Sequence, residues 1–190
     1  MSNKGKASGF SSDTGPLDGD PSNPAVFPVI MIGTAMFFGI PLYLGGVEGR
    51  LASLLGNDLP AAASFYTTLG ALSITAAHGF AMQMNGNARK EYKVAHPKSS
   101  NEVGYLNAGR GYYNMVEHMP FFFFNFYLCA QTSPCIAGSA AIVWGIGRIL
   151  YTSDYAYGGP KGRSRGFIMA TMSSMACLGV ALCNSVLFPY

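Results

Sequence analysis

Apolar residues in this chain gather into five long stretches that are separated by short polar segments. A helix needs about 20 residues to cross a bilayer, and every one of these stretches reaches that length. The first stretch also carries no charge and is longer than the apolar region of a signal peptide, so we expect a real helix there. The pattern predicts an all-α integral membrane helix bundle. Its expected spans are residues 26–46, 60–86, 103–131, 135–157 and 166–188.

The expected spans divide the chain into three parts. Residues 1–25 are rich in Gly, Ser, Asp and Pro and cannot bury a core, which predicts a polar N-terminal tail. Residues 26–46 form an additional transmembrane helix, and residues 60–190 form a membrane domain of four helices. In the additional helix, Gly33-x5-Gly39 and Gly45-Gly46 would suit close contact with another helix.

Composition agrees with the membrane assignment. Only 11% of the residues are charged, 49% are hydrophobic, and Gly accounts for 24 of 190 residues, which leaves too little polar surface for a soluble monomer. The cysteines lie within or at the ends of apolar runs, so we interpret them as free thiols rather than a disulfide framework. They are Cys129, Cys135, Cys177 and Cys183.

Basic residues concentrate in two connecting segments, which follow the second and the fourth expected spans. If five helices alternate in direction, both segments fall on one side of the membrane, together with the N-terminus. The positive-inside tendency then places that side toward the cytosol or its organellar equivalent. The residues are Arg89, Lys90, Lys93 and Lys98 in one segment and Lys161, Arg163 and Arg165 in the other.

Polar side chains interrupt the third span at a helical spacing. Arg110, Asn114 and Glu117 occupy positions i, i+4 and i+7, which lie in one sector of a helix. A charge at the middle of a bilayer costs about 2.5 to 3.5 kcal/mol, so we expect these groups to face a site inside the protein rather than lipid. The spacing predicts a polar pocket inside the bundle.

A second polar stripe lies on the fourth span, where Arg148, Tyr151 and Tyr155 follow at i, i+3 and i+7. Arg148 could pack there while bonded to a carbonyl group or to Glu117. Tyrosines and basic residues near helix ends are also common at membrane interfaces, and we favour that explanation for a set close to the end of this span. The set is Tyr157, Lys161 and Arg165.

Three blocks of residues together resemble the MAPEG family of membrane proteins, which act in eicosanoid and glutathione metabolism. The first block is Ala88-Arg89-Lys90-Glu91-Tyr92-Lys93-Val94 with Pro97, and the second is Arg110-x3-Asn114-x2-Glu117-x2-Pro120. The third runs from Gly147-Arg148-x-Leu150-Tyr151 to Pro160-x2-Arg163-Ser164-Arg165-Gly166. The similarity covers about residues 60–190, and its ordered blocks most resemble the microsomal glutathione transferase type 3 branch.

The resemblance implies a homotrimer of four-helix units that binds glutathione in clefts between neighbouring subunits. Arg110, Asn114 and Glu117 match positions that hold the charged ends of the peptide, and Arg89 matches a basic contact near the membrane surface. The reaction it implies is conjugation or reduction of lipophilic electrophiles or lipid hydroperoxides.

Within the implied cleft, Tyr151 and Tyr155 match tyrosines that line it. Arg163 matches the arginine thought to stabilise the thiolate of glutathione. The loop before it is one residue longer than in the leukotriene-synthesising members, so Arg165 stays a lesser candidate. The residue types fit the ligand, because a tripeptide with two carboxylates, an ammonium group and a thiol needs both cations and an anion.

The chain departs from the family pattern at two positions. Tyr112 stands where several relatives have Gln, which removes an amide partner for the peptide. His118 follows Glu117 where the leukotriene-synthesising members have Tyr, and it could keep a hydrogen bond. For His118 and for His78, we prefer a packing role over catalysis or metal and haem ligation.

Other functions remain open at this stage. The extra helix and the tail also suit a catalytically silent accessory subunit that docks on a large membrane complex through residues 1–50, with its polar stripes as a lipid or pigment site. A channel or transporter is less favoured, because no inverted repeat is visible. The basic residues form no clustered face, so nucleic-acid binding is not expected. The expected location is the endoplasmic reticulum or another organelle membrane.

Overall fold

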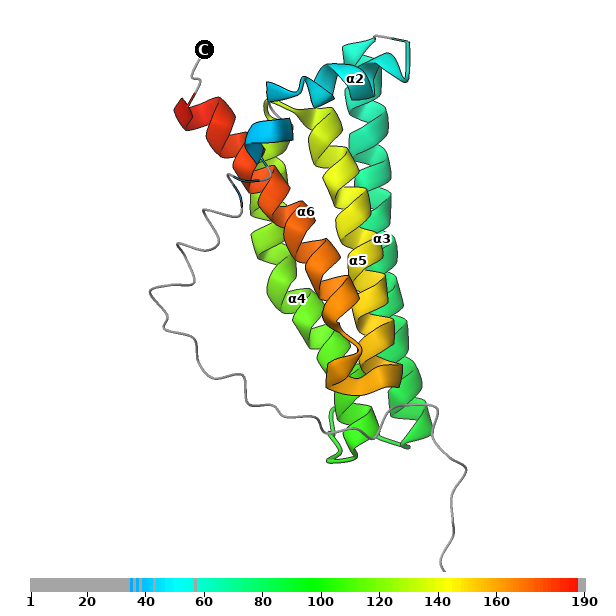
Figure 1. Cartoon of the computed structure of the whole chain (residues 1–190). Coiled ribbons are helices and arrows are strands. Elements are labelled where there is room, and N and C mark those ends of the chain that lie inside the picture. The colour runs from blue at the N-terminus through cyan, green and yellow to red at the C-terminus, as the bar shows by residue number, and fades with distance from the viewer. Residues whose placement is uncertain (1–34, 36, 38, 43, 57, 188–190) are drawn as a thin grey trace, which may run out of the picture.

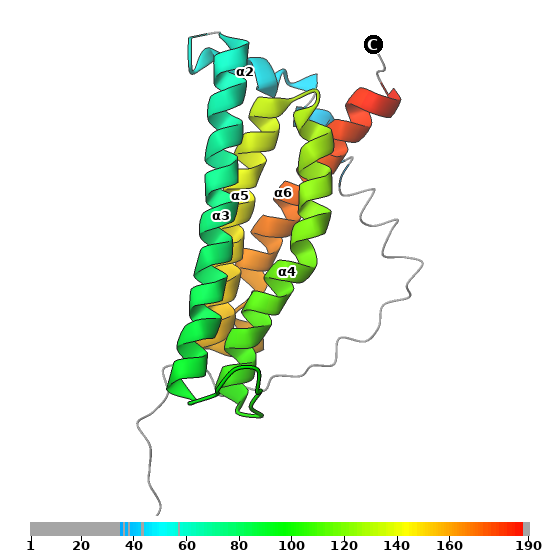
Figure 2. The same cartoon turned by 180° about the vertical axis from the view of Figure 1, so that it is seen from behind.

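Four long helices lie lengthwise in one bundle (Figures 1 and 2). The computed structural model describes residues 35, 37, 39–42, 44–56 and 58–187, and these contain helices and turns but no strand. A short helix, α2 (Val47–Ser53), lies across the end of the bundle where α3 begins (Figure 1). The long helices are α3 (Leu59–Glu91), α4 (Val103–Ala130), α5 (Pro134–Gly158) and α6 (Ser164–Leu182).

The helix bounds follow the apolar stretches of the sequence closely. The last four expected spans coincide with α3 to α6, so the all-α, four-helix prediction is confirmed. The clearest difference is α3, which continues five residues past the expected end at 86. Arg89 and Lys90 therefore belong to its last turn, where cations interact favourably with the helix dipole. Of the first expected span, residues 35, 37, 39–42 and 44 are helical and residues 45 and 46 form a turn; its other residues lie outside the described part, as does the predicted tail.

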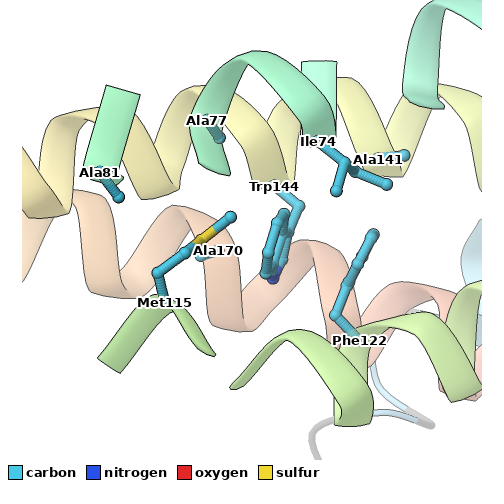
Figure 3. Packing of buried hydrophobic residues seen from close by; sticks show 8 residues of the cluster. All are labelled: Ile74, Ala77, Ala81, Met115, Phe122, Ala141, Trp144 and Ala170. Carbon is cyan, nitrogen blue, oxygen red and sulfur yellow. The ribbon is translucent and has the colours of Figure 1, made fainter. Parts of the chain in front are cut away.

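The core joins all four long helices. Trp144 of α5 stacks on Phe122 of α4 with their ring centroids 4.4 Å apart, and Figure 3 shows the two rings facing each other between the helices. Alanines from the other helices fill the remaining space, so the helices approach closely. The buried cluster consists of Ile74, Ala77, Ala81, Met115, Phe122, Ala141, Trp144 and Ala170.

Glycines allow α5 to contact α3 and α6 directly. A Cβ placed on Gly145 would lie 2.8 Å from the backbone oxygen of Ser73, and one on Gly166 would lie 2.6 Å from the Cα of Tyr151. Only glycine fits at such crossings without moving a helix. The contact of Gly166 matters for the site described below, because it brings the start of α6 against Tyr151.

Residues before α3 contact the bundle, and two of these contacts involve Gly39 and Glu48. Gly39 lies against Gly179 of α6, in agreement with the close helix contact expected from the sequence. The carboxylate of Glu48 on α2 accepts hydrogen bonds from the backbone N–H groups of Cys135 and Ile136, both at 2.9 Å. Glu48 thereby caps the N-terminus of α5, a contact that no sequence pattern predicted.

The two basic connecting segments lie at the same end of the bundle, opposite α2 (Figure 1). One joins α3 to α4, and the other is the turn of η1 (Gly159–Lys161) that joins α5 to α6. Beyond α6 the chain continues as the π-helix η2 (Cys183–Leu187). The four cysteines are buried and free, as predicted.

Candidate functional site

A cavity of about 400 Å³ opens near the end of the bundle that carries the basic segments. It is bounded by side chains from α4, α5 and the first turn of α6. Polar groups form one part of its wall and apolar groups the other, as expected where a polar ligand meets a lipophilic one. The lining residues are Asn114, Tyr151, Arg163, Ser164, Phe167 and Ile168.

The turn between α5 and α6 places Arg163 at this cavity. Helix α5 ends at Gly158, the φ of 67° at its C-cap residue Gly159 suits glycine, and η1 reverses the chain within three residues. Arg163 is the N-cap residue of α6, so its backbone lies at the positive end of that helix, and its side chain makes no capping hydrogen bond. The guanidinium carbon is 5.8 Å from the centroid of the Tyr155 ring, which is itself 5.7 Å from the ring of Tyr151.

Arg148 lies behind the cavity and is only 2% exposed. Its Nη2 donates a hydrogen bond of 2.9 Å to Oδ1 of Asn114. The rings of Trp144 and Tyr151 flank the guanidinium carbon at 5.6 and 5.0 Å. From the sequence, we expected a carbonyl group or Glu117 as its partner. The structure instead provides the side-chain oxygen of Asn114, while the charge of Glu117 acts on Arg148 from a greater distance.

The stripe of Arg110, Asn114 and Glu117 does not form a pocket inside the bundle, so that expectation is wrong. Asn114 points inward to Arg148, but Arg110 and Glu117 are exposed on the surface of the single chain. The cause is the helical spacing, because Asn114 lies on the side of this sector that is nearest to the buried positions of α4, such as Gly111 and Met115. Both charges nevertheless remain close to the site, because Arg110 interacts electrostatically with Tyr151 and Glu117 with Arg148.

The other candidates lie at the margin of the site or away from it. Arg89 does not line the cavity; its Nη1 donates to the backbone oxygen of Lys98 at 3.1 Å, and it lies 5.8 Å from the ring of Tyr105. Arg165 forms a two-pronged ion pair with Asp154, with its closest N–O distance 2.9 Å, so it is already engaged.

Tyr112 and His78 belong to the packing between α3 and α4. Their ring centroids are 6.1 Å apart, which agrees with the packing role that we preferred for His78. Tyr112 is partly buried and packs against the core cluster, so it does not replace the missing glutamine as a polar group of the cavity.

Sequence reasoning missed three residues of the cavity wall: Ser164, Phe167 and Ile168. Their signal was position alone, because they occupy the first turns of the helix that Arg163 begins. Neither the apolar pattern nor the charge pattern distinguishes Phe167 and Ile168 from side chains that face lipid.

The fold and the composition define an all-helical membrane protein. Two of its helical segments, Pro134–Lys161 and Ser164–Ser185, are long and apolar enough to cross a membrane. Residues 59–183 match the sequence profile of the MAPEG family, so the chain belongs to this family. It is also 35% identical over 98 residues to a Synechocystis sp. protein named "Uncharacterized protein sll1147"; the match covers 51% of this chain and 71% of that protein.

Proposed function

We propose that this chain is a membrane-bound glutathione transferase and peroxidase, which conjugates lipophilic electrophiles with glutathione or reduces lipid hydroperoxides. The observation that carries the proposal is the cavity in which Arg163, Asn114 and Tyr151 meet beside the apolar side chains of Phe167 and Ile168. Family membership supports it, because the MAPEG family includes glutathione-dependent enzymes. Glutathione is the co-substrate, and no other cofactor is needed.

Arg163 is the proposed catalytic residue. A thiol with a pKa near 8.5 is only a few per cent ionised at pH 7, so the enzyme must favour the thiolate. The guanidinium group of Arg163 and the N-terminus of α6 both stabilise negative charge at this place. In transfer, the thiolate attacks an electrophilic carbon, a C–S bond forms, and the leaving group departs with its electron pair.

Peroxidase chemistry would use the same thiolate. The sulfur attacks the terminal oxygen of a lipid hydroperoxide, the O–O bond breaks, and the lipid leaves as an alcohol after taking up a proton. The resulting sulfenic form of glutathione then reacts with a second glutathione to give the disulfide and water. The lipid would enter past Phe167 and Ile168, which line the cavity next to Ser164.

The proposed assembly is a homotrimer with one glutathione in each cleft between neighbours. Arg110 and Glu117 support it, because both are exposed on a single chain within a segment that would otherwise face lipid. Covering them with a second copy removes the cost of about 2.5 to 3.5 kcal/mol per charge at mid-bilayer. Arg110 would then bind a carboxylate of glutathione and Glu117 its ammonium group. Tyr155 would line the cleft, and Arg89 would provide a basic contact near the membrane surface.

In the proposed arrangement the chain crosses an organelle membrane, such as the endoplasmic reticulum, several times. Its basic segments and the cavity lie on the cytosolic side or its equivalent. The positive-inside tendency supports this orientation, because both basic segments are at one end of the bundle (Figure 1).

A direct test is the activity of the purified protein in detergent or lipid vesicles. We expect conjugation of glutathione to 1-chloro-2,4-dinitrobenzene, or reduction of a fatty-acid hydroperoxide that consumes glutathione. A pure, folded protein that does neither would reject the proposed function.

A catalytically silent accessory subunit is the second candidate. It is favoured by the helical residues that lie before the family match and by their exposed apolar side chains, such as Leu44 and Leu54, at 66% and 73% exposure. This alternative predicts a chain that purifies with a larger complex and leaves it when residues 1–50 are removed. Glu48→Ala in the full-length chain is the control for the loss of the Glu48 cap on α5 in that deletion. Unchanged association after the deletion would count against this alternative.

A further inference from the structure

The buried guanidinium group of Arg148 has an unusual set of neighbours. It is 2% exposed, and among the described residues no acidic side chain lies within ion-pair distance of it. Two aromatic rings and the side-chain oxygen of Asn114 surround it instead. Its Nε makes no hydrogen bond in the described part of the chain, so the guanidinium group keeps an unused donor.

The contact between Arg148 and Asn114 determines how the amide group is oriented. An amide can present either its oxygen or its nitrogen to a neighbour, but arginine has donors only. The oxygen of Asn114 must therefore face Arg148, as the 2.9 Å contact shows. The amide nitrogen, with its two hydrogens, is left for the cavity that Asn114 lines.

We infer that Arg148 is a positioning residue, which holds the amide of Asn114 so that only its N–H groups face a bound ligand. Every polar residue lining the cavity can then donate a hydrogen bond to a ligand: the amide of Asn114, the guanidinium group of Arg163 and the hydroxyl groups of Tyr151 and Ser164. No acidic residue lines this cavity among the described residues.

The donors in this wall indicate which group of the ligand lies against it. A donor-rich wall next to a buried cation favours anionic oxygen, so a carboxylate of glutathione lies against Asn114 and Arg148 acts through it. The ammonium group is directed away from this wall, toward the exposed Glu117. This inference rests on the proposed function, because it specifies how glutathione is oriented in the same cavity.

A measurement without ligand tests the contact itself. Asn114→Asp keeps the oxygen that Arg148 binds, so with Arg148 present we expect a melting temperature at or above that of the wild type. In an Arg148→Gln background the same change buries a carboxylate without its cation, and we expect a clear loss of melting temperature. An equal effect of Asn114→Asp in both backgrounds would overturn the inference.

Asn125 offers a matched control on the same helix. Asn125 is a buried amide, whereas Asn114 is partly buried; its nitrogen donates to Ser174, and no hydrogen bond joins it to Arg148 in the described part of the chain. Asn125→Asp should therefore shift the melting temperature by the same amount in both backgrounds. A dependence on Arg148 equal to that of Asn114→Asp would show that the coupling is not specific, which would also overturn the inference.

A binding measurement tests the direction of the amide. Glutathione is compared with two analogues, one with the glycyl carboxylate as an ethyl ester and one lacking the carboxylate of the γ-glutamyl residue. Only one of the two analogues lacks the carboxylate that lies against Asn114. We expect the wild type to bind glutathione about tenfold or more tightly than that analogue, since hydrogen bonds to charged groups are strong. Asn114→Asp and Arg148→Gln should each remove most of that preference, whereas Arg148→Lys, which still offers only donors, should retain more of it.

The outcomes separate the two claims. If the wild type binds glutathione but Asn114→Asp keeps the full preference against both analogues, the inference is wrong and the proposed function stands. If the wild type does not bind glutathione, the proposed function fails, and the melting temperatures still decide whether Arg148 holds the amide.

Discussion

Arg148 and Arg163 show how strongly position decides the role of the same side chain. Arg148 is enclosed by Trp144, Tyr151 and Asn114, where it can orient a neighbour but not touch a ligand freely. Arg163 is exposed at the start of α6 and lines the cavity. Only Arg163 can stay in contact with a thiolate while the reaction proceeds, which is why we assign it the catalytic role.

Replacing Arg163 tests that role. We expect Arg163→Ala to lower kcat about a hundredfold, which corresponds to the loss of about two pKa units of thiolate stabilisation, while melting temperature and oligomeric state stay unchanged. The measurement is steady-state conjugation at saturating glutathione. Arg165→Ala is the control, because Arg165 is two residues away but is bound to Asp154. An equal loss in both variants would show that Arg163 has no special role.

The sequence predicted which residues gather near the site but not how they are oriented. The helical spacing placed Arg110, Asn114 and Glu117 on one sector of a helix, and this is correct. Whether that sector faces the bundle or its surface depends on how α4 is rotated against α5, which the packing of Gly111 against Thr152 determines. Spacing within one helix carries no information about that rotation.

At the level of elements, apolar stretches predicted the helices almost completely. The two ends of α5 follow from the turn residues Pro134 and Gly159, whereas α3 continues through polar residues to Glu91. Contacts between elements were harder to foresee, and the cap that Glu48 provides to α5 is the clearest case. A single acidic residue between two apolar stretches gives no sign of which helix end it reaches.

The Glu48 cap can be tested by mutation. Glu48→Ala removes two hydrogen bonds to the start of α5, and we expect it to destabilise the fold by about 1 to 2 kcal/mol. The measurement is thermal unfolding in detergent. Arg50→Ala is the control on the same short helix, since no contact to α5 is found for it. Equal melting temperatures for Glu48→Ala and the wild type would contradict the capping role.

The contact between α5 and α6 can be tested at Gly166. A side-chain carbon there collides with the backbone of Gly147 and Tyr151, so Gly166→Ala must push α6 away from the cavity. We expect a loss of about 1 to 3 kcal/mol in stability together with weaker glutathione binding. Gly79→Ala on α3 is the control, because a Cβ there meets nothing within 4 Å. Unchanged stability and binding in Gly166→Ala would show that the close contact is not needed.

At the level of the whole molecule, the chain combines a family domain with an attached N-terminal part. The family match covers residues 59–183, yet Gly39 contacts α6 and Glu48 caps α5 from outside it. The attached part is therefore integrated with the bundle at the end opposite the cavity (Figures 1 and 2). It can influence stability and association without reaching the chemistry.

The exposed charges of Arg110 and Glu117 connect the single chain to the proposed assembly, and they allow the most direct test. Glutathione binding should be measured by calorimetry on the detergent-solubilised protein, with its mass determined by light scattering. We predict saturable binding to a particle of three 20.1 kDa chains, a loss of about tenfold or more in affinity for Glu117→Gln, and no loss for Glu102→Gln. A monomer without saturable binding, or a trimer whose affinity does not change with Glu117→Gln, would contradict the account.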